Sequence, residues 1–225
     1  MKICKYGITL NRIRKEDLEF VRQKRNSEKA ENLSDPGDEI TPDMQQEWFD
    51  GINNSENFYF IIEYRGVKIG MLNNKNIDWE ACASETSLFL WDKSYRETIV
   101  PLLASLCMIE ISFYYLNWNA SYIRIHKDNL NAIENTVKLG YEITEGKEIV
   151  ESQLYFLTRE LFETKGKEIQ QEARSYIEKK SGEGYLLLEP FDYESGIAQK
   201  IENHFTESGI YLHRKGKAGS RLYFR

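Results

Sequence analysis

The sequence has little cysteine, histidine or proline: its 225 residues include 3 cysteines, 3 histidines and 4 prolines. The cysteines are Cys4, Cys82 and Cys107, and the histidines are His126, His204 and His213. The cysteines form no Cys-x-x-Cys motif and cannot all pair, so we expect buried or spare thiols rather than a disulfide framework. The scattered histidines supply no ligand set for zinc, and we therefore expect no metal.

Long apolar runs are missing too. The longest nearly uncharged stretch, Ile99 to Ile109, is broken by Ser105 and is about half as long as the roughly 20 residues of a membrane-spanning helix. The basic first residues are not followed by the apolar segment that a secretory signal needs. These absences predict a cytoplasmic protein without a membrane span.

The sequence carries no excess of positive charge. Its formal net charge is −6, which argues against a nucleic-acid partner. Hydrophobic residues at 41%, aromatic residues at 13% and charged residues at 29% are ordinary globular values that exclude wholesale disorder. A chain of this length can bury a core and form one large or two unequal domains.

Apolar periodicity predicts a mixed α/β fold with the order βααβββαβαβ. The expected strands cover residues 7–14, 58–64, 67–73, 85–90 and 122–126, with a final pair at 141–144 and 153–158; the expected helices cover 15–25, 41–52, 101–116 and 129–139. Thr41 is the expected N-cap of the second helix, whose apolar face comprises Met44, Trp48, Phe49 and Ile52. Asp35 to Asp38 form a predicted turn.

The composition changes after Leu161, where residues 163–168 form a charged segment that contains Gly166. We predict a domain boundary there, between a first domain over 1–163 and a small α-β-α-β-β domain over 166–225. The second unit is near the lower size limit for independent folding, so we expect it to pack on the first domain or on a protein partner. Its last hairpin is basic and aromatic, and its ordinary explanation is a solvated tip rather than a nucleic-acid surface.

The most informative segment runs from Asp128 to Tyr141 and reads DNLNAIENTVKLGY. Asn129 can cap the helix and present an amide to a ligand, Ala132 permits close packing, and Gly140 supplies a left-handed end. The segment resembles the D-N-x-x-A-I-x-x-x-x-K-L-G-[FY] signature of GNAT acyltransferases. Further matches to the ribosomal-protein and sugar-amine branch of that superfamily are residues 10–14, 16–18, 25–26, 41–49, 66, 69–70 and 85–90.

The resemblance covers about residues 8–161 and implies a central mixed sheet flanked by helices, with acetyl-CoA as cosubstrate. In that family acetyl-CoA lies where two neighbouring strands part, here expected at Phe89 and Leu90. Its pyrophosphate is held by a loop written R/Q-x-x-G-x-G/A, which here reads Arg96, Glu97, Thr98, Ile99, Val100, Pro101. Only the arginine matches, because branched side chains replace glycine, a carboxylate is added and Pro101 lacks an N–H donor. The sequence therefore predicts a degenerate cofactor loop.

The resemblance also indicates catalytic positions. Thr136 stands where many family members have a tyrosine acid, and its hydroxyl is a poorer proton donor than a phenol. Glu85, at the start of a strand, and His126, at the end of another, are candidate bases. The ordinary explanation of each is a polar residue bonded at a strand end.

Arg25 and Asn26 resemble a pair near the acceptor entrance of this branch. A guanidinium there can hold a phosphate or carboxylate of the acceptor. The alternative is helix-end chemistry, in which a cation and an asparagine cap complement the C-terminal dipole.

Two hypotheses follow. The first is an N-acyltransferase that moves an acetyl group from acetyl-CoA to a primary amine, either an amino-sugar nucleotide or a protein N-terminus. The second is a GNAT-like binding module that has lost acetyl-CoA binding and acts through its cleft or its C-terminal domain.

Overall fold

A computed structural model describes residues 1–27, 39–146, 149–176, 184–208, 210–215 and 219–224. The strands are β1 (Lys2–Lys5), β2 (Ile8–Arg12), β3 (Phe58–Tyr64), β4 (Val67–Asp78), β5 (Ala83–Leu90), β6 (Ala120–His126), β7 (Glu142–Ile143), β8 (Ser152–Thr158), β9 (Tyr185–Leu188), β10 (Tyr211–Lys215) and β11 (Arg221–Phe224). The α-helices are α1 (Leu18–Ser27), α2 (Pro42–Ile52), α3 (Val100–Glu110), α4 (Leu130–Lys138), α5 (Arg159–Thr164), α6 (Lys167–Arg174), α7 (Pro190–Glu194) and α8 (Ile197–Ser208). The predicted turn at 35–38 lies outside the described residues.

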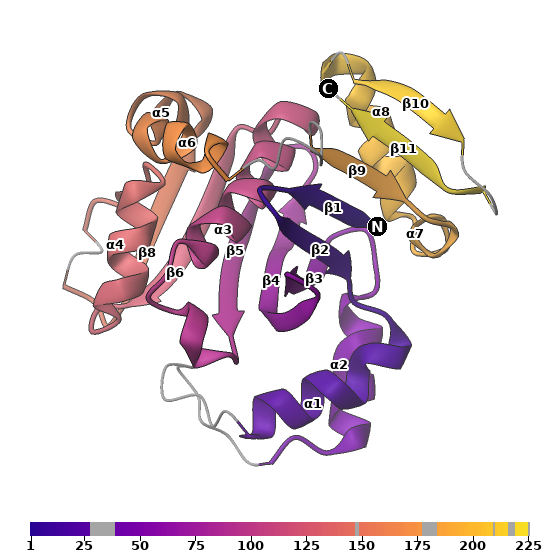
Figure 1. The fold of residues 1–225 in the computed structure, drawn as a ribbon, viewed down its shortest axis with the longest axis horizontal. Coiled ribbons are helices and arrows are strands. Elements are labelled where there is room, and N and C mark those ends of the chain that lie inside the picture. Colours follow the sequence, from indigo (N-terminus) through magenta and orange to yellow (C-terminus); the bar gives the residue numbers. More distant parts are fainter. Residues whose placement is uncertain (28–38, 147–148, 177–183, 209, 216–218, 225) are drawn as a thin grey trace.

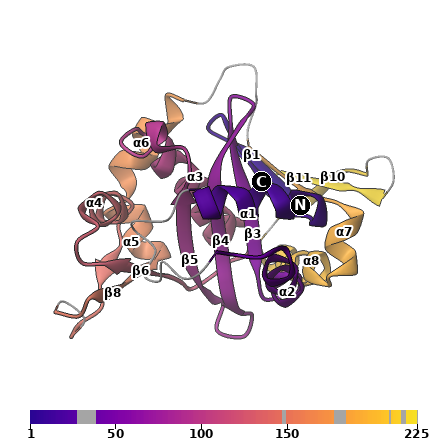
Figure 2. The ribbon, with the colours of Figure 1, turned by 90° about the horizontal axis from the view of Figure 1, so that it is seen from below.

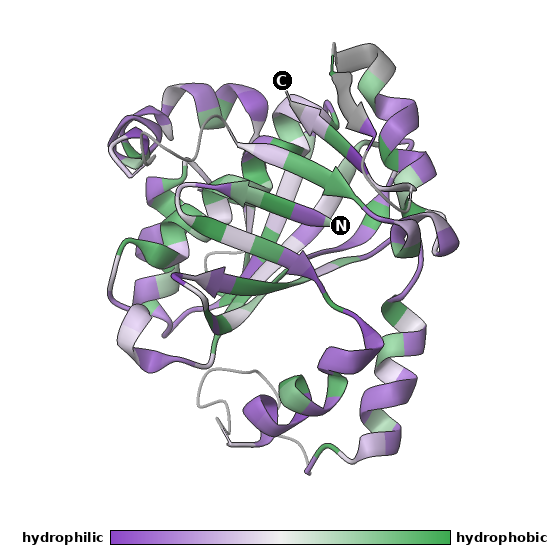
Figure 3. Cartoon of the chain, turned by 45° about the vertical axis from the view of Figure 1, so that its right-hand side comes forward, coloured by the Kyte–Doolittle hydropathy of each residue, from purple (hydrophilic) through white to green (hydrophobic). Residues whose placement is uncertain are grey.

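The described strands form one sheet in the order β10-β11-β9-β1-β2-β3-β4-β5-β6-β8-β7 (Figure 1). Every neighbouring pair is antiparallel except β5 and β6. Apolar residues concentrate on the strands and polar residues on the outer helices (Figure 3). This mixed α/β sheet flanked by helices confirms the predicted fold class.

Helices cover both faces of the central strands. Helix α3 is apolar almost all round and nearly every residue in it is buried, as expected for a helix enclosed on all sides. It continues into a short π-helix over Ile111–Tyr115. On the opposite face α1 and α2 lie together across β3 and β4 (Figure 2), where Val21, Phe49, Ile61 and Met71 belong to one separate apolar cluster.

The parallel contact between β5 and β6 is short. The two strands pair only from Ala83 with Ala120 to Thr86 with Ile123. Strand β5 continues to Leu90 and remains paired with β4 up to that residue. From Ser87 onward the β6 side of β5 therefore carries no strand partner, and this parting positions the candidate site.

The strands after residue 184 continue the sheet. Strand β9 pairs with β1, from Lys2 with Leu187 to Cys4 with Tyr185. Side chains also connect the two parts of the chain: Arg12 Nη1 donates to Asp192 Oδ1 at 2.9 Å and to Ser195 Oγ at 2.8 Å. The division into two domains stays a prediction, and in this structure the two parts share one sheet and one apolar core.

Three local expectations differ from the structure. The predicted strand over 7–14 is the second arm of a hairpin, because Tyr6 and Gly7 adopt positive φ and turn β1 into β2. The charged segment 163–168 is part of α5 and α6 rather than an open joint. In α2 the buried residues are Gln45 and Phe49, and Trp48 and Ile52 pack against the same apolar cluster, whereas Met44 is 50% exposed, so Gln45 takes the inward position that was expected for Met44.

Candidate functional site

A cleft of about 230 Å³ lies between α3 and α4, above the point where β5 and β6 part. Three sets of side chains line it: the end of β5, one face of α3 and one face of α4. The lining residues are Leu72, Thr86, Ser87, Leu88, Phe89, Leu90, Lys93, Arg96, Pro101, Ser105, Ile109, Ile123, Asn129, Asn131, Ala132, Asn135, Thr136, Leu139 and Tyr141. The cleft is mainly apolar with polar groups at its rim, which suits an extended ligand that has amide groups.

Helix α4 presents its asparagines to this cleft. Asn129 caps the helix, since its Oδ1 accepts the N–H of Ala132 at 3.2 Å. The remaining amide group of Asn129 lies at the cleft together with Asn131 and Asn135. Gly140 ends the segment at φ +97, and a Cβ at that position would lie 2.9 Å from the carbonyl oxygen of Leu161. The cap and the left-handed end predicted from the sequence are both present.

The loop from β5 to α3 is held by its own hydrogen bonds. Arg96 donates through Nε and Nη2 to the carbonyl oxygen of Leu90, at 3.0 and 2.7 Å. The N–H of Thr98 bonds to the Tyr95 carbonyl at 3.2 Å, and the N–H of Val100 bonds to Thr98 Oγ1 at 3.2 Å.

These bonds determine which backbone N–H groups the loop can offer to a ligand. Between Glu97 and Pro101, two backbone N–H groups are engaged within the loop and Pro101 has none to offer. The side chains of Glu97 and Thr98 are exposed, whereas Ile99 and Val100 pack toward the core. Two of the N–H groups in this loop are therefore engaged internally, which limits how many the loop can offer to an anion.

Two hydroxyl groups lie at the inner part of the cleft. Thr136 is buried, at 4% exposure, on the cleft face of α4. Tyr141 is also buried, its hydroxyl lies 2.9 Å from Ser121 Oγ, and burial raises its pKa. Tyr141 therefore keeps its proton at neutral pH and is the phenol that the cleft contains.

The two candidate bases lie outside the cleft lining. The carboxylate of Glu85 contacts Lys75 Nζ at 3.0 Å and Arg124 Nε at 3.5 Å. His126 lies at the end of β6 with its side chain 42% exposed, and its Nδ1 accepts the N–H of Asp128 at 3.3 Å. Glu85 lies nearer to the cleft than His126, because it precedes the cleft residue Ser87 by two residues and lies on the same face of β5.

The structure separates the two candidate acceptor residues. Asn26 joins α1 to the segment before α2, since its amide donates to the carbonyl oxygen of Ile40 and accepts the N–H of Ile40, both at 3.0 Å. Arg25 instead lies over the ring of Trp48, 5.7 Å from its centroid. Burial lowers the pKa of Arg25. Asn26 thus has a clear structural function, whereas the contact of Arg25 among the described residues is the ring of Trp48.

Sequence reasoning missed a polar row on the α1 and α2 face of the sheet. Tyr59 pairs with Asn73, and Asn73 pairs with Ser87, so the three side chains point to the same side. Asn73 Nδ2 donates to Ser87 Oγ at 2.6 Å. Alternation marks each residue as facing one side, but only the register between three strands brings them into one row.

The described residues offer no site for a metal and no membrane span. They contain no group of three or more His, Cys, Asp or Glu side chains placed to hold a metal ion. None of the helices that they form combines the length and the hydropathy needed to cross a membrane.

The comparisons with known proteins found one family and several similar folds. The family model for the acetyltransferase (GNAT) domain matches residues 8–142, more than half of the chain. A search of curated proteins gave no significant match.

Among solved structures the fold is similar to RimL, a ribosomal-protein alpha-N-acetyltransferase in complex with coenzyme A, at 12% identity and a TM-score of 0.63, over 70% of this chain and 98% of that chain. It is similar to FdhC, a nucleotide-linked sugar GNAT, at 20% identity and a TM-score of 0.62, over 79% and 99% of the two chains. It is also similar to the spermidine N-acetyltransferase of Vibrio cholerae with CoA and spermine, at 14% identity and a TM-score of 0.58, over 70% and 99%. At these identities the likeness shows the fold.

Proposed function

The chain belongs to the GNAT acetyltransferase family, and from this premise we propose that it transfers an acetyl group from acetyl-CoA to a primary amine. One observation carries the proposal. Strands β5 and β6 part after Thr86, and the parting opens into the cleft of about 230 Å³ between α3 and α4. An intact sheet would have filled this space with a continuing strand pair.

The residues around the cleft have distinct roles in this proposal. The backbone of Phe89 and Leu90 forms the open strand edge along which the pantetheine amides lie. Arg96 positions the end of that edge, because its guanidinium holds the Leu90 carbonyl oxygen. Asn129 supplies a side-chain amide at the opposite wall. When bound, acetyl-CoA supplies the activated thioester.

Proton transfer in this proposal falls to side chains beside the cleft. A primary amine is protonated at neutral pH and must lose that proton before its nitrogen attacks the thioester and CoA leaves as a thiolate that takes up a proton. Glu85 is the candidate base closest along β5 to the cleft residue Ser87. Thr136 and Tyr141 are the buried hydroxyl groups beside the cleft, and a phenol is the better acid of the two. His126 stays a weaker candidate, since it lies outside the cleft lining.

The acceptor class follows from the neighbours and from Arg25. RimL is described as acting on a ribosomal protein and FdhC as acting on a nucleotide-linked sugar. For this chain we propose an amine of the same kinds, a protein N-terminus or an amino-sugar nucleotide, with Arg25 as a binding residue for the acceptor.

A second function is favoured by the β5 to α3 loop. Its amides at Thr98 and Val100 are engaged internally and Pro101 has none, so the diphosphate of acetyl-CoA gains little from this loop. In this alternative the domain is an inactive binding module that acts through its cleft or through residues 166–225, which can also hold a protein partner.

Calorimetric titration with acetyl-CoA and with CoA distinguishes the two functions. Micromolar binding by the unmodified protein, followed by acetylation of amines in an acceptor screen, is the expected result. Lack of binding at millimolar ligand would contradict the transferase proposal. The double substitution Ile99→Gly with Pro101→Gly then identifies the cause, because restored binding assigns the loss to the loop.

A further inference from the structure

A cysteine and a histidine from distant parts of the chain meet beside the turn that joins β4 to β5. Cys82 lies in that turn and His204 lies on α8, and Cys82 Sγ is 4.0 Å from His204 Nε2. Both residues are half-buried, so the pair lies at the edge of the core rather than inside it. It is outside the lining of the cleft and has no part in the proposed acetyl transfer.

The imidazole ring is held with its basic nitrogen beside the thiol. His204 Nδ1 lies 3.0 Å from the carbonyl oxygen of Lys200, one turn earlier in α8. A carbonyl oxygen can only accept, so Nδ1 donates and the neutral ring keeps its lone pair on Nε2, the nitrogen beside Cys82 Sγ. The ring of Trp79 lies 5.0 Å from the imidazole ring, at an interplanar angle of 52°. These contacts fix both the tautomer and the position of His204.

The backbone of Cys82 is fixed as well. Its φ is +52, a left-handed conformation that a residue with a Cβ adopts at a cost. Its carbonyl oxygen accepts the N–H of Asn119 at 2.8 Å, which joins the turn to the segment before β6. The thiol has two acceptors within reach, His204 Nε2 and the carbonyl oxygen of Trp79 at 3.5 Å. A base therefore lies beside the thiol proton in the folded chain.

The other two cysteines have different neighbours. Cys107 is 1% exposed, and burial raises the pKa of its thiol well above the ordinary value. Cys4 is half-buried like Cys82, but its Sγ lies beside a hydroxyl group, 3.6 Å from Thr9 Oγ1. The thiolate is the reactive form of cysteine, and a neighbouring imidazole promotes it. Cys82 has such a neighbour in this structure.

The charged side chains around the pair have both signs. Asp78 and Glu80 belong to the same turn, and Asp78 Oδ1 accepts the N–H of Glu80 at 3.0 Å. Lys200 is exposed on α8. This mixed setting selects neither an anionic nor a cationic reagent, so the sulfur chemistry defines the class of the reagent.

We propose that Cys82 is a site of reversible thiol–disulfide exchange with low-molecular-weight disulfides, and that His204 is its base. The Sγ atom attacks one sulfur of the disulfide while His204 Nε2 takes the thiol proton. A new S–S bond forms at Cys82 as the S–S bond of the reagent breaks. The leaving thiolate takes the proton from the imidazolium and departs as a thiol, so the sulfur of Cys82 is oxidised and the leaving sulfur is reduced. An added thiol of the same class reverses the exchange.

The size of the effect follows from the share of thiolate. An ordinary thiol is a few per cent thiolate at neutral pH, so complete ionisation raises the rate by roughly thirtyfold at most. Nucleophilicity falls as a thiol becomes more acidic, which reduces the gain to about tenfold. We therefore expect Cys82 to exchange about tenfold faster than Cys4.

The test compares the cysteines within the full chain. The reduced protein is mixed with oxidised glutathione at neutral pH, remaining thiols are alkylated at timed intervals, and peptide mass spectrometry gives the modified fraction at each cysteine. The expected result is a rate ratio of Cys82 to Cys4 of about ten, with Cys107 unmodified. A ratio near one overturns the proposal.

The same measurement in urea tests the dependence on the fold. Cys82 and His204 are 122 residues apart in the sequence, so the pair forms only in the folded chain. The ratio of Cys82 to Cys4 should therefore fall to about one in urea, because all thiols then have similar surroundings. A ratio that persists in urea comes from the local sequence and also overturns the proposal.

Matched variants assign the effect to the imidazole. His204→Gln keeps a polar side chain but removes the base, and it should lower the Cys82 rate about tenfold while the Cys4 rate is unchanged. Gln199→Ala is the control, because Gln199 is exposed on the same helix and donates to Asn203 at 3.0 Å, and it should change neither rate. A loss of folding in either variant is recognised by modification of Cys107. An unchanged ratio in folded His204→Gln removes His204 as the base and contradicts the proposal.

Discussion

Two arginines on the same chain segment make a matched test of how the C-terminal strands are held. Arg12 contacts Asp192 at 2.9 Å with side chains 3% and 0% exposed. Arg14 contacts Glu189 at 2.7 Å with side chains 34% and 30% exposed. Both guanidinium groups also lie near the ring of Phe191, at 4.9 and 5.7 Å. The two pairs therefore differ chiefly in burial.

Burial sets the size of the expected effect. Arg12→Met removes the guanidinium from the buried carboxylate of Asp192, which keeps the N-terminal ammonium of Met1 as its ion-pair partner, and it also removes the hydrogen bonds to Ser195 and Asn53. Breaking a buried pair from one side costs about 3–5 kcal/mol of unfolding free energy, and the remaining contact with Met1 places the expected loss toward the lower end of that range. Arg14→Met removes a partly exposed pair, which is worth about 1 kcal/mol or less. For a chain of this length the first loss lowers Tm by roughly 6–20 °C.

Urea unfolding followed by tryptophan fluorescence and by circular dichroism measures both losses. The expected result is a large decrease in unfolding free energy for Arg12→Met, a small one for Arg14→Met, and coincident transitions by the two probes. Equal losses in the two variants would refute the reasoning, because burial would then not govern the energy. A separate early transition in Arg12→Met would show that β9 to β11 unfold apart from the rest of the sheet.

Three further predictions follow from single sites. Gly140→Ala should cost about 1–3 kcal/mol in a thermal or urea melt, more than Gly146→Ala, because both have positive φ but only Gly140 has backbone atoms within contact distance of a new Cβ. Burial raises the pKa of Tyr141 above the value near 10 of an unfolded chain, so its contribution to stability is complete below about pH 10 and is lost as the pH rises further. Tyr141→Phe should therefore flatten the decline of unfolding free energy above that pH by up to about 1.4 kcal/mol per pH unit, measured by urea titration at each pH. Glu85→Gln should lower kcat by about a hundredfold if acetyl transfer is found, whereas His126→Gln should leave it within about threefold, and the reverse order would exchange their roles.

Local signals in the sequence predicted much of the fold. Thr41 accepts the N–H of Met44 at 3.2 Å, as an N-cap before Pro42 should. Asn129 and Gly140 begin and end α4 as their residue types predict. These features were predictable because each depends on a few neighbouring residues and their backbone preferences.

The inward face of α2 and the close packing at Gly166 were not predictable from local signals. One helical turn before Trp48 and Phe49 lie Met44 and Gln45, and either could continue the inward face of α2. In the structure Gln45 is buried against the sheet and Met44 is exposed. The sequence marks Gly166 only as part of a charged segment at a predicted domain boundary, whereas in the structure a Cβ there would lie 2.7 Å from the carbonyl oxygens of Leu139 and Phe162. Only the tertiary structure distinguishes a glycine that permits motion from one that permits contact.

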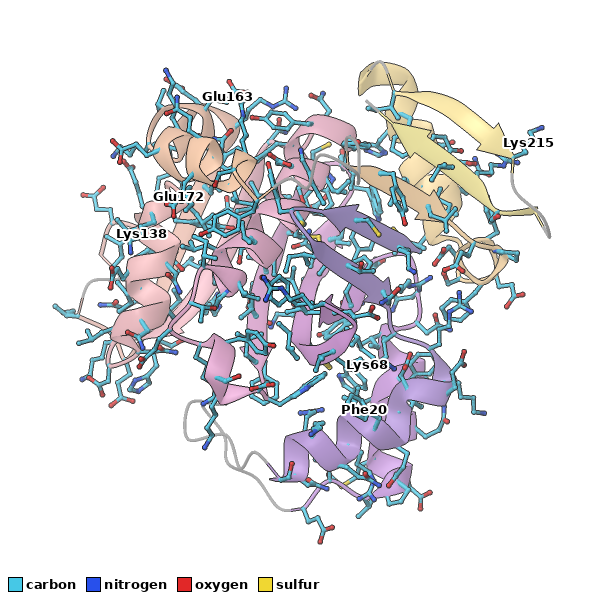
Figure 4. All side chains as sticks on the ribbon, in the orientation of Figure 1. Phe20, Lys68, Lys138, Glu163, Glu172 and Lys215 are labelled. Carbon is cyan, nitrogen blue, oxygen red and sulfur yellow. The ribbon has the colours of Figure 1, made fainter. Side chains whose placement is uncertain are left out.

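The candidate site likewise contains residues that the sequence could predict and residues that it could not. Residues at the cleft, such as Arg96 and Asn129, could be named because a local motif carries them. The polar row on the opposite face has no motif, since Tyr59, Asn73 and Ser87 are far apart in the sequence and become neighbours through the register of β3, β4 and β5. Figure 4 labels two exposed charges, Lys138 on α4 and Lys68, whose Nζ lies 5.3 Å from the ring centroid of Phe20.

Strand β5 is where the two halves of the proposed reaction meet. Because side chains alternate, Thr86 and Leu88 face α3 whereas Glu85 and Ser87 face α1 and α2. Pairing with β6 ends at Thr86, so Ser87 is the first residue whose backbone edge is open to the cleft, while its side chain faces α1 and α2. In the proposed reaction, a donor in the cleft and an amine on the α1 and α2 face would meet at this point of the strand. The loop at the far end of β5 lies apart from this point of the strand, so the double substitution Ile99→Gly with Pro101→Gly is expected to change donor binding without changing the residues where β5 and β6 part.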